Sequence, residues 1–288
     1  MEKYKSLYLL RYNSRFELVG DFFLLMDKVK WKIKLYKNYK KNPYIDYNFK
    51  YLIKDLLYPS IRKENYKNYL NSMHGVAKNL YHIDFSVNTP SGTLEEVFIE
   101  RIYTEHSDFL PEKKDVIIDA GAQYGDYTLL CSKYFSVKKI YAFEPLINNF
   151  NVLMENIKLN SVNNVEVYNI ALGISEGIKN FHIDENMINK FHGKNTISVA
   201  IKSIDSFKFD NVNILKIDVE GSEYDLIRGA IKTIKNSHPK IIMEIHSKDL
   251  KVKCLKFLER YGYKNRYTEN SRKNVNNHMD LVQNLFLY

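Results

Sequence analysis

The chain from Asp115 to Tyr288 alternates short apolar runs with longer amphipathic stretches. Short apolar runs bounded by turn residues are typical of buried strands, whereas longer stretches with apolar positions three and four apart are typical of helices. The pattern predicts strands at 116–119, 139–143, 165–169, 213–218, 241–246, 261–267 and 281–287, and helices at 128–134, 147–159, 223–234 and 250–261. Strands separated by helices pair in parallel, so we expect a doubly wound α/β sheet.

Two further patterns precede this region. Apolar residues between Leu18 and Tyr36 recur at steps of three and four, which predicts an amphipathic helix, although 30–35 also alternates like a short strand. Residues 81–104 hold two alternating runs around turn-forming residues, which predicts a β-hairpin. We therefore expect a mainly helical region at 1–75, a hairpin lead-in at 76–110 and the sheet domain at 111–288. Residues 177–202 are long enough to form a lid or to hold an extra strand.

Charge is concentrated near the amino terminus. The net charge is +9, and residues 1–70 hold 16 Lys and Arg against 7 Asp and Glu, whereas the remaining residues hold 27 of each. A basic segment of this kind could bind an anionic membrane surface, a phosphorylated substrate or, less favoured, nucleic acid. The alternative is a solvated helix face that only aids solubility. The oligomeric state cannot be read from this pattern.

Composition narrows the class of protein. Hydrophobic residues make up 45% of the chain and charged residues 27%, which is too apolar for intrinsic disorder. Cys131 and Cys254 are the only two cysteines, so a disulfide framework and a cysteine-built zinc site are excluded. The sequence has no apolar run near the roughly 18 residues of a membrane span and no signal-peptide pattern. We expect a cytoplasmic protein, with a peripheral membrane position left open.

The first predicted strand leads into a glycine-containing turn. Gly121 permits a tight turn close to a ligand, and Gly125 lets the next helix begin against the sheet. Asp119 at the end of the strand can accept hydrogen bonds from an ammonium group or, through water, from a ligand. Because ligands bind at the carboxyl ends of strands in open α/β sheets, residues 119–125, including Gln123 and Tyr124, are candidate cofactor contacts.

The second predicted strand adds an acidic residue at its end. Glu144 follows Gly121 by 23 residues, near the offset of about 20 at which a carboxylate reaches ribose hydroxyls. Both NAD and S-adenosylmethionine carry such a diol. Gln123 stands where a dinucleotide motif needs its middle glycine, so a pyrophosphate would be crowded. The residues therefore favour S-adenosylmethionine.

Several motifs together resemble one known family. They are DAGAQYG at 119–125, FEP at 143–145, NIALG at 169–173, LKIDVEGSE at 215–223 and MEIH at 243–246. Over residues 80–288 the chain resembles the FkbM family of S-adenosylmethionine-dependent methyltransferases. The resemblance implies a Rossmann-like seven-stranded class I methyltransferase sheet with an antiparallel last strand. It also implies cofactor binding by Asp119, Gly121 and Glu144, and an adenine framed near Ala171.

Candidate catalytic residues follow the fourth and fifth main strands. Asp218, Glu220 and His246 lie at or just beyond strand ends, and Glu220 or His246 could remove a hydroxyl proton. A divalent metal is a less favoured option, with Asp218, Glu244 and His246 as ligands. Glu244 and His246 are two residues apart and so point to the same side of a strand. The alternative for Asp218 is a helix cap.

We therefore expect a methyltransferase that acts on a hydroxyl of a sugar, glycan or glycolipid, the acceptor chemistry being what the family resemblance implies. The first alternative is an RNA methyltransferase that uses the basic segment to hold phosphates. The second is a membrane or complex adaptor whose methyltransferase core no longer turns over. The sequence does not identify the acceptor, because fold does not fix function.

Overall fold

The structure is a computed structural model that describes residues 73–183, 195–270 and 282–288. The chain divides into two compact units, and the described residues belong to the unit formed by 73–184 and 189–288. Nearly all of the predicted helical region at 1–75 lies outside the described residues and stays a prediction. Within the described ranges, no helix is long and apolar enough to cross a bilayer.

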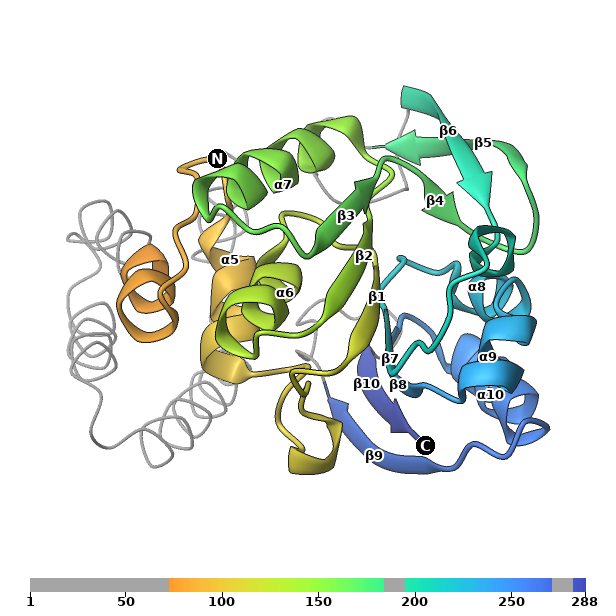
Figure 1. Ribbon diagram of the computed structural model, residues 1–288. Coiled ribbons are helices and arrows are strands. Elements are labelled where there is room, and N and C mark those ends of the chain that lie inside the picture. Colours follow the sequence, from red (N-terminus) through yellow and green to blue (C-terminus); the bar gives the residue numbers. More distant parts are fainter. Residues whose placement is uncertain (1–72, 184–194, 271–281) are drawn as a thin grey trace, which may run out of the picture. The chain divides into compact units, whose positions relative to one another are not determined.

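A seven-stranded sheet forms the centre of this unit (Figure 1). Its order is β3-β2-β1-β7-β8-β10-β9, and β10 pairs antiparallel with both of its neighbours while the other pairings are parallel. The strands are β1 (Val116–Ala120), β2 (Lys139–Phe143), β3 (Val165–Tyr168), β7 (Ile214–Ile217), β8 (Lys240–Ile245), β9 (Asn265–Asn270) and β10 (Gln283–Leu287). The predicted Rossmann-like methyltransferase sheet with its reversed strand is confirmed.

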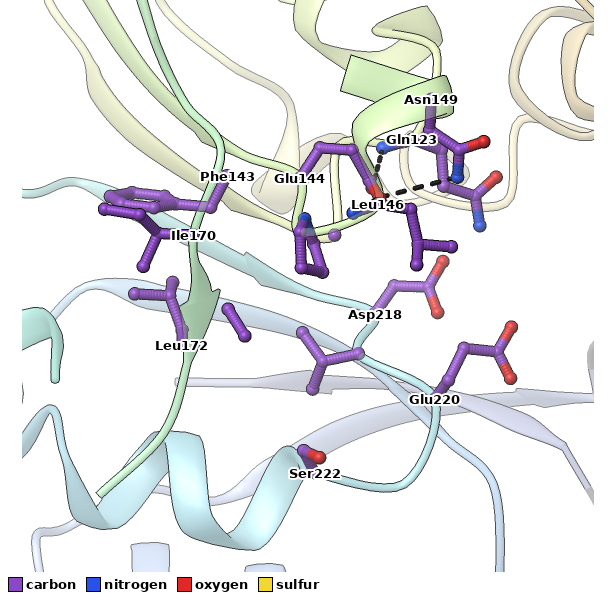
Figure 2. Close-up of a pocket in the computed structure, with 14 residues that line it drawn as sticks. Gln123, Phe143, Glu144, Leu146, Asn149, Ile170, Leu172, Asp218, Glu220 and Ser222 are labelled. Carbon is purple, nitrogen blue, oxygen red and sulfur yellow. Dashed lines mark hydrogen bonds between the residues drawn. The ribbon is translucent and has the colours of Figure 1, made fainter. Parts of the chain in front are cut away.

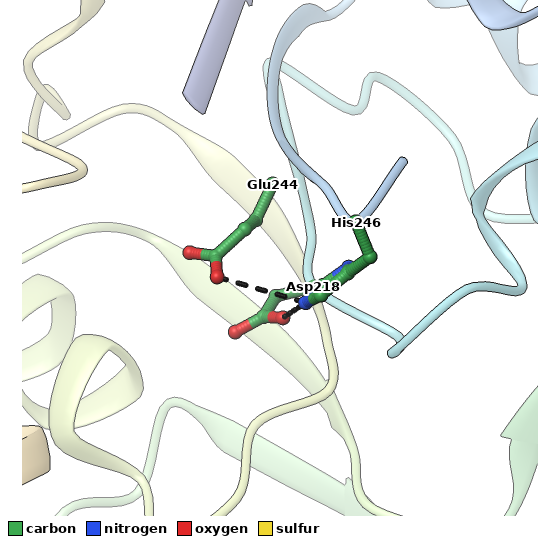
Figure 3. A group of neighbouring side chains, drawn as sticks. All are labelled: Asp218, Glu244 and His246. Carbon is green, nitrogen blue, oxygen red and sulfur yellow. Dashed lines mark ion pairs between the residues drawn. The ribbon is translucent and has the colours of Figure 1, made fainter. Parts of the chain in front are cut away.

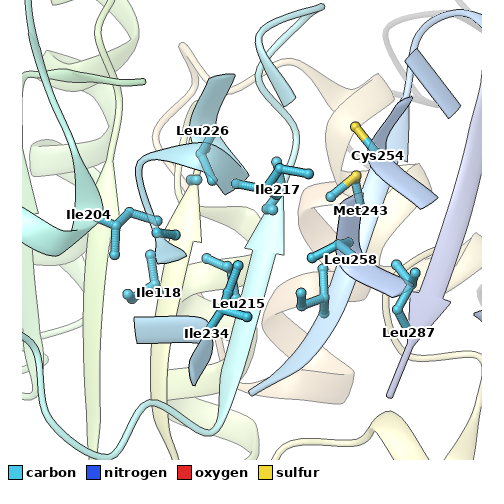
Figure 4. Close-up of a cluster of buried hydrophobic side chains, with 14 of the residues drawn as sticks. Ile118, Ile204, Leu215, Ile217, Leu226, Ile234, Met243, Cys254, Leu258 and Leu287 are labelled. Atoms are coloured by element: carbon cyan, nitrogen blue, oxygen red, sulfur yellow. The ribbon is translucent and has the colours of Figure 1, made fainter. Parts of the chain in front are cut away.

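Helices connect the strands and cover both faces of the sheet. They are α6 (Asp126–Leu129), which continues as a wider turn at Leu130–Tyr134, α7 (Ile147–Leu159), α8 (Glu223–Arg228), α9 (Ile231–Ser237) and α10 (Lys248–Glu259). One core cluster joins Ile118 of β1 and Leu215 of β7 to Leu226 and Ile234 of α8 and α9 (Figure 4). These side chains are fully buried, which is the burial that stabilises such a layered domain.

The topology brings the first glycine turn next to Asp218. Strand β1 lies between β2 and β7, so the crossover helices leave it in two directions and the carboxyl ends of β1 and β7 border a crevice. Gly121 follows β1 and Asp218 follows β7. The Asp218 backbone N–H donates to Ala120 O at 2.9 Å, which keeps the two strand ends together.

The predicted hairpin at 81–104 is wrong. The structure has a helix at 73–81, a short helix α5 (Ser91–Leu94) and a wider helical turn at Glu95–Glu100. Leu94, Val97 and Phe98 are buried, and their spacing of three and four places them on one side of a helix. Pro90 precedes the helix in extended conformation, where its missing N–H costs nothing. A 3₁₀ turn at Ser107–Phe109 then leads to β1.

Two other segments, 223–234 and 177–202, differ from the pattern or add to it. The predicted helix at 223–234 is interrupted after Arg228 and resumes at Ile231. Only glycine fits at position 229, because a Cβ there would lie 1.9 Å from Gly173 O. Asp205, in a 3₁₀ turn at Ile204–Phe207, then accepts hydrogen bonds from Lys232 N and Thr233 N at the start of α9. Residues 177–202 contribute two strands to a second sheet of order β4-β6-β5, formed by β4 (Ala171–Leu172), β5 (Gly177–Ile183) and β6 (Asn195–Lys202).

Candidate active site

A pocket of about 570 Å³, including its open mouth, lies at the carboxyl ends of β1, β2 and β7. Figure 2 shows the carboxylates of Glu144, Asp218 and Glu220 toward one end and the side chains of Phe143, Ile170 and Leu172 toward the other. The pocket is therefore polar at one end and apolar at the other.

The turn after β1 is built so that only glycine fits at its centre. Gly121 has φ +78°, and a Cβ there would lie 1.7 Å from Asp218 O. The N–H groups of Gly121 and Ala122 both donate to Phe143 O, at 3.0 and 2.9 Å. These contacts fix the turn against both neighbouring strand ends, so its backbone forms one wall of the pocket.

A buried lysine, Lys216, holds this turn in place, and it was not among the residues singled out from the sequence. Lys216 is 3% exposed, donates to Gly121 O at 2.7 Å and lies 3.2 Å from Asp119 Oδ1 and 3.9 Å from Asp218 Oδ2. Burial opposes its charge, but the two carboxylates outweigh that cost and raise the pKa of Lys216. A lysine inside the apolar run of β7 was the available signal, since a buried ammonium needs carboxylate partners.

Glu144 occupies the end of β2 as predicted, close to the glycine turn. Its carboxylate accepts hydrogen bonds from Gln123 N at 2.9 Å, Leu146 N at 2.8 Å and Asn149 Nδ2 at 3.4 Å. Burial raises the pKa of Glu144 to about 7 despite these donors. The Asn169 side chain donates to the carbonyls of Glu144 and Pro145 and so holds this loop in place.

The predicted cofactor residues divide into two groups. Gly121, Gln123, Glu144 and Ala171 line the pocket, whereas Asp119, Tyr124 and Gly125 are not among its lining residues. Asp119 is fully buried, and its carboxylate faces Lys216 and the Thr128 hydroxyl, which donates to it at 2.6 Å.

Tyr124 and Gly125 support the turn from behind. Tyr124 is 2% exposed, and its carbonyl accepts from Asn156 Nδ2 at 2.8 Å. Gly125 has φ +83° and precedes α6, where a Cβ would lie 2.4 Å from Leu153 Cδ1. The structure therefore gives Asp119, Tyr124 and Gly125 contacts that shape the turn, and any direct cofactor contact by them remains a prediction.

The three predicted catalytic residues lie together at the polar side of the crevice. His246 Nε2 is 3.5 Å from Glu220 Oε2 and 3.8 Å from Asp218 Oδ1. Glu220, with φ +50°, lines the pocket together with Asp218. Glu244 Oε1 is 3.6 Å from the same imidazole nitrogen (Figure 3).

Further contacts fix this cluster from behind. The His246 Nδ1 atom is 2.7 Å from Glu223 Oε1, and Glu223 is fully buried. The Tyr103 hydroxyl, itself buried, donates to Asp218 Oδ2 at 3.0 Å. Neither Glu223 nor Tyr103 was singled out from the sequence. Glu223 begins a predicted helix and Tyr103 lay in the predicted hairpin, so neither pattern indicated a site.

Burial and neighbouring charges shift the pKa values of the residues in this cluster. Burial opposes an imidazolium, but the hydrogen bond to Glu223 and the charges of Asp218 and Glu220 raise the pKa of His246 to about 10. Burial and the nearby Asp218 charge raise the pKa of Glu244 well above its usual range. Such a group of acids can bind and orient a hydroxyl and accept its proton. Asp218, Glu244 and His246 also have the ligand types and spacing of a metal site.

Comparison with known proteins gives a family match. The model of the methyltransferase FkbM domain matches residues 119–264, which is just over half of the chain. This range contains the glycine turn, Glu144 and the whole acidic cluster around His246.

Two individual relatives share less than a third of their aligned residues with this chain. "Methyltransferase 1" of Beauveria bassiana is 27% identical over 183 residues, covering 51% of this chain and 72% of the relative. "Hexuronic acid methyltransferase AglP" of Haloferax volcanii is 29% identical over 143 residues, covering 47% of this chain and 58% of the relative. A solved methyltransferase FkbM of Methylobacillus flagellatus is 15% identical with a TM-score of 0.44, covering 76% of this chain and 58% of that one.

Proposed function

Because the chain belongs to the FkbM methyltransferase family, we propose that it transfers a methyl group from S-adenosylmethionine to a hydroxyl oxygen of a sugar, glycan or glycolipid. The observation that carries the proposal is the placement of Glu144 and the Gly121 turn in one pocket with Asp218 and Glu220. The relative AglP, whose name gives a hexuronic acid as its substrate, supports a carbohydrate acceptor.

The cofactor half of the proposal follows from the polarity of the pocket. The Glu144 carboxylate would accept hydrogen bonds from the two ribose hydroxyls, and Phe143, Ile170 and Leu172, which line the apolar end, would contact the adenine. Carboxylates rather than cationic side chains line the pocket, which suits a sulfonium and disfavours a pyrophosphate. Gln123, in the left-handed region with φ +47°, presents its backbone N–H to Glu144 and so sets the orientation of this carboxylate.

The transfer half needs alignment and a proton acceptor. Methyl transfer forms a bond from the acceptor oxygen to the methyl carbon and breaks the bond from that carbon to sulfur, so placement of the two substrates accounts for much of the rate. Asp218 and Glu220 lie between the cofactor pocket and His246, where the acceptor hydroxyl binds. Glu220 takes the hydroxyl proton, because its carboxylate lines the pocket whereas His246 is not among the lining residues.

The test is transfer of a labelled methyl group from S-adenosylmethionine to uronic-acid oligosaccharides, neutral oligosaccharides and RNA by the full chain. We expect label on a carbohydrate as an ether, which mild alkali does not remove. Label released by mild alkali would place the methyl on a carboxyl group, and label on RNA alone would support the nucleic-acid alternative; either outcome overturns the hydroxyl assignment. No transfer to any acceptor would support the adaptor alternative.

Matched variants locate the reaction in the pocket. Asp218→Asn should lower the transfer rate at least about ten-fold, because it removes a buried charge beside the acceptor. Asp225→Asn is the control, since Asp225 lies on α8 with a side chain that is 48% exposed and contacts Arg228 at 3.8 Å in a surface ion pair. Equal loss in both variants would contradict a role for the crevice.

A further inference from the structure

The imidazole of His246 has two nitrogens in very different surroundings. The Nδ1 atom makes one short contact, 2.7 Å, to Glu223 Oε1. The Nε2 atom is nearly equidistant from three carboxylate oxygens, at 3.5 Å from Glu220, 3.6 Å from Glu244 and 3.8 Å from Asp218. A proton on Nε2 would normally draw one oxygen to about 2.7–2.9 Å, so three longer distances do not describe a hydrogen bond.

Ligand atoms that bind the same metal ion lie at similar distances from one another, as the carboxylate oxygens do from His246 Nε2. Two ligand atoms that each lie about 2.1 Å from a cation are roughly 3.0–3.4 Å apart at right or tetrahedral angles. The observed distances exceed this range by a few tenths of an ångström, which small side-chain rotations can remove. One donor atom each from Asp218, Glu244 and His246 lie within 4.8 Å of one another (Figure 3).

Asp218 supplies an independent sign of a missing partner. It is 8% exposed, and its Oδ2 accepts a hydrogen bond from the Tyr103 hydroxyl. Its Oδ1 is buried and accepts no hydrogen bond from any described residue, although it is the oxygen that faces His246. A buried carboxylate oxygen without a donor is costly unless something else binds it, and a cation would satisfy it.

Glu223 completes the arrangement from the other side of the ring. A histidine that binds a metal through Nε2 commonly donates its Nδ1–H to a carboxylate, which fixes the ring orientation. Glu223 is fully buried and is itself fixed, since its Oε1 also accepts the Gly221 N–H at 2.9 Å. The imidazole is thus held with Nε2 directed at the three carboxylates.

We propose that Asp218 Oδ1, Glu244 Oε1 and His246 Nε2 bind one divalent cation, with Glu220 within reach as a fourth ligand and Glu223 orienting the imidazole. Mixed carboxylate and imidazole ligands suit ions of the Mn²⁺ and Zn²⁺ type rather than Ca²⁺. The site adjoins the pocket through Asp218 and Glu220. Its use in catalysis, polarising the acceptor hydroxyl, rests on the proposed methyl transfer, whereas the binding itself does not.

The test is direct binding of Mn²⁺ to the full, untagged chain after dialysis against a chelator, with neither cofactor nor acceptor present. Loss of the electron paramagnetic resonance signal of free Mn²⁺ should report one ion per chain. Zn²⁺ should displace the Mn²⁺ and Ca²⁺ should not. Absence of binding, or equal displacement by Ca²⁺ and Zn²⁺, would overturn the proposal.

Substitutions assign the ligands. Glu244→Gln and His246→Gln should each weaken Mn²⁺ binding at least about ten-fold. Glu269→Gln makes the same chemical change two strands away on β9, where Glu269 pairs with His106, and should bind Mn²⁺ as the wild type does. Mn²⁺ should also raise the thermal midpoint of the wild type and of Glu269→Gln but not of the other two variants.

Each result of the substitutions decides the assignment. Unchanged affinity in Glu244→Gln and His246→Gln would overturn it, as would an equal loss in the Glu269→Gln control. Methyl transfer that survives the chelator together with proven Mn²⁺ binding would remove the catalytic role and leave the site. Failure of methyl transfer with intact Mn²⁺ binding would instead count against the proposed function alone.

Discussion

Replacement of Lys216 by methionine tests how the glycine turn is held. The change keeps the length and most of the apolar stem of the side chain but removes the ammonium that bonds Gly121 O and faces Asp119 and Asp218. Loss of one partner from a buried ion pair typically costs about 3–5 kcal/mol, because the other charge stays buried and uncompensated. Asp119 is fully buried, so this range applies without discount for solvent screening.

The assay is thermal and urea unfolding of the full chain. At about 2–4 °C per kcal/mol for a large domain, Lys216→Met should lower the melting temperature by roughly 6–20 °C. Lys139→Met is the matched control, because Lys139 also contacts a carboxylate, Glu166, at 2.7 Å, but at the surface. A surface pair contributes about 0.2–1 kcal/mol, so this control should change little.

A double substitution separates the charge from the packing. Asp119→Asn keeps an acceptor for the Thr128 hydroxyl and removes the negative charge that the Lys216→Met substitution leaves unpaired. The double variant Asp119→Asn, Lys216→Met should therefore be more stable than the sum of the single losses predicts, by about 0.5–3 kcal/mol. Strict additivity, or a Lys216→Met variant as stable as Lys139→Met, would refute the view that this ammonium holds the turn.

Four further predictions test other parts of the site. Gly121→Ala should abolish cofactor binding, because Gly121 has φ +78° and the added Cβ would meet Asp218 O. Gly92→Ala is the control: a Cβ there has nothing within 4 Å, so the free energy of unfolding should stay the same or rise by up to about 1 kcal/mol. Calorimetric titration of the cofactor and melting curves check both variants. Cofactor affinity should fall about ten-fold per pH unit below 7, since only ionised Glu144 accepts both ribose hydroxyls, and titrations from pH 5.5 to 8.5 that give a constant affinity would contradict this. Burial raises the pKa of Glu144 in the folded state from 4.5 to about 7, so between these values the folded protein holds a proton on Glu144 that the unfolded chain has lost. The contribution of Glu144 to the free energy of unfolding should therefore decline as the pH rises from 4.5 to 7 and then stay level. Urea unfolding at each pH measures this. Tyr103→Phe deletes the donor to Asp218 Oδ2 and should cost about 1–3 kcal/mol in urea unfolding; no loss would show that water replaces this hydroxyl.

The central strands of the sheet could be predicted because β1 and β7 are buried along their whole length. Strands that are buried on both faces, such as Val116–Ala120, form continuous apolar runs that alternate with amphipathic helices. The segment at 81–104 was misread because its apolar positions fit a period of two in part, while the buried Leu94, Val97 and Phe98 follow the helical period. The need for glycine at position 229 comes from its close tertiary approach to Gly173, which no local pattern contains.

Sequence position predicted those residues whose place in the pocket follows from lying at the end of a strand. Glu144 and Asp218 follow strands and therefore reach the pocket. Asp119 also ends a strand, but its side chain turns to Lys216, and that choice depends on which buried cation lies opposite. Glu223 meets His246 only through the packing of α8 beside β8, so distance in the sequence concealed the pair.

The most direct test of the central claim is calorimetric titration of S-adenosylmethionine into the full chain and two matched variants. The account predicts saturable binding of one molecule per chain, weakened about ten- to hundred-fold by Glu144→Gln, whose amide nitrogen cannot accept a ribose hydroxyl. Glu166→Gln, at a half-exposed carboxylate on β3, should bind as the wild type does. No binding by the wild type, or equal affinity in all three proteins, would contradict the claim that this pocket holds the methyl donor.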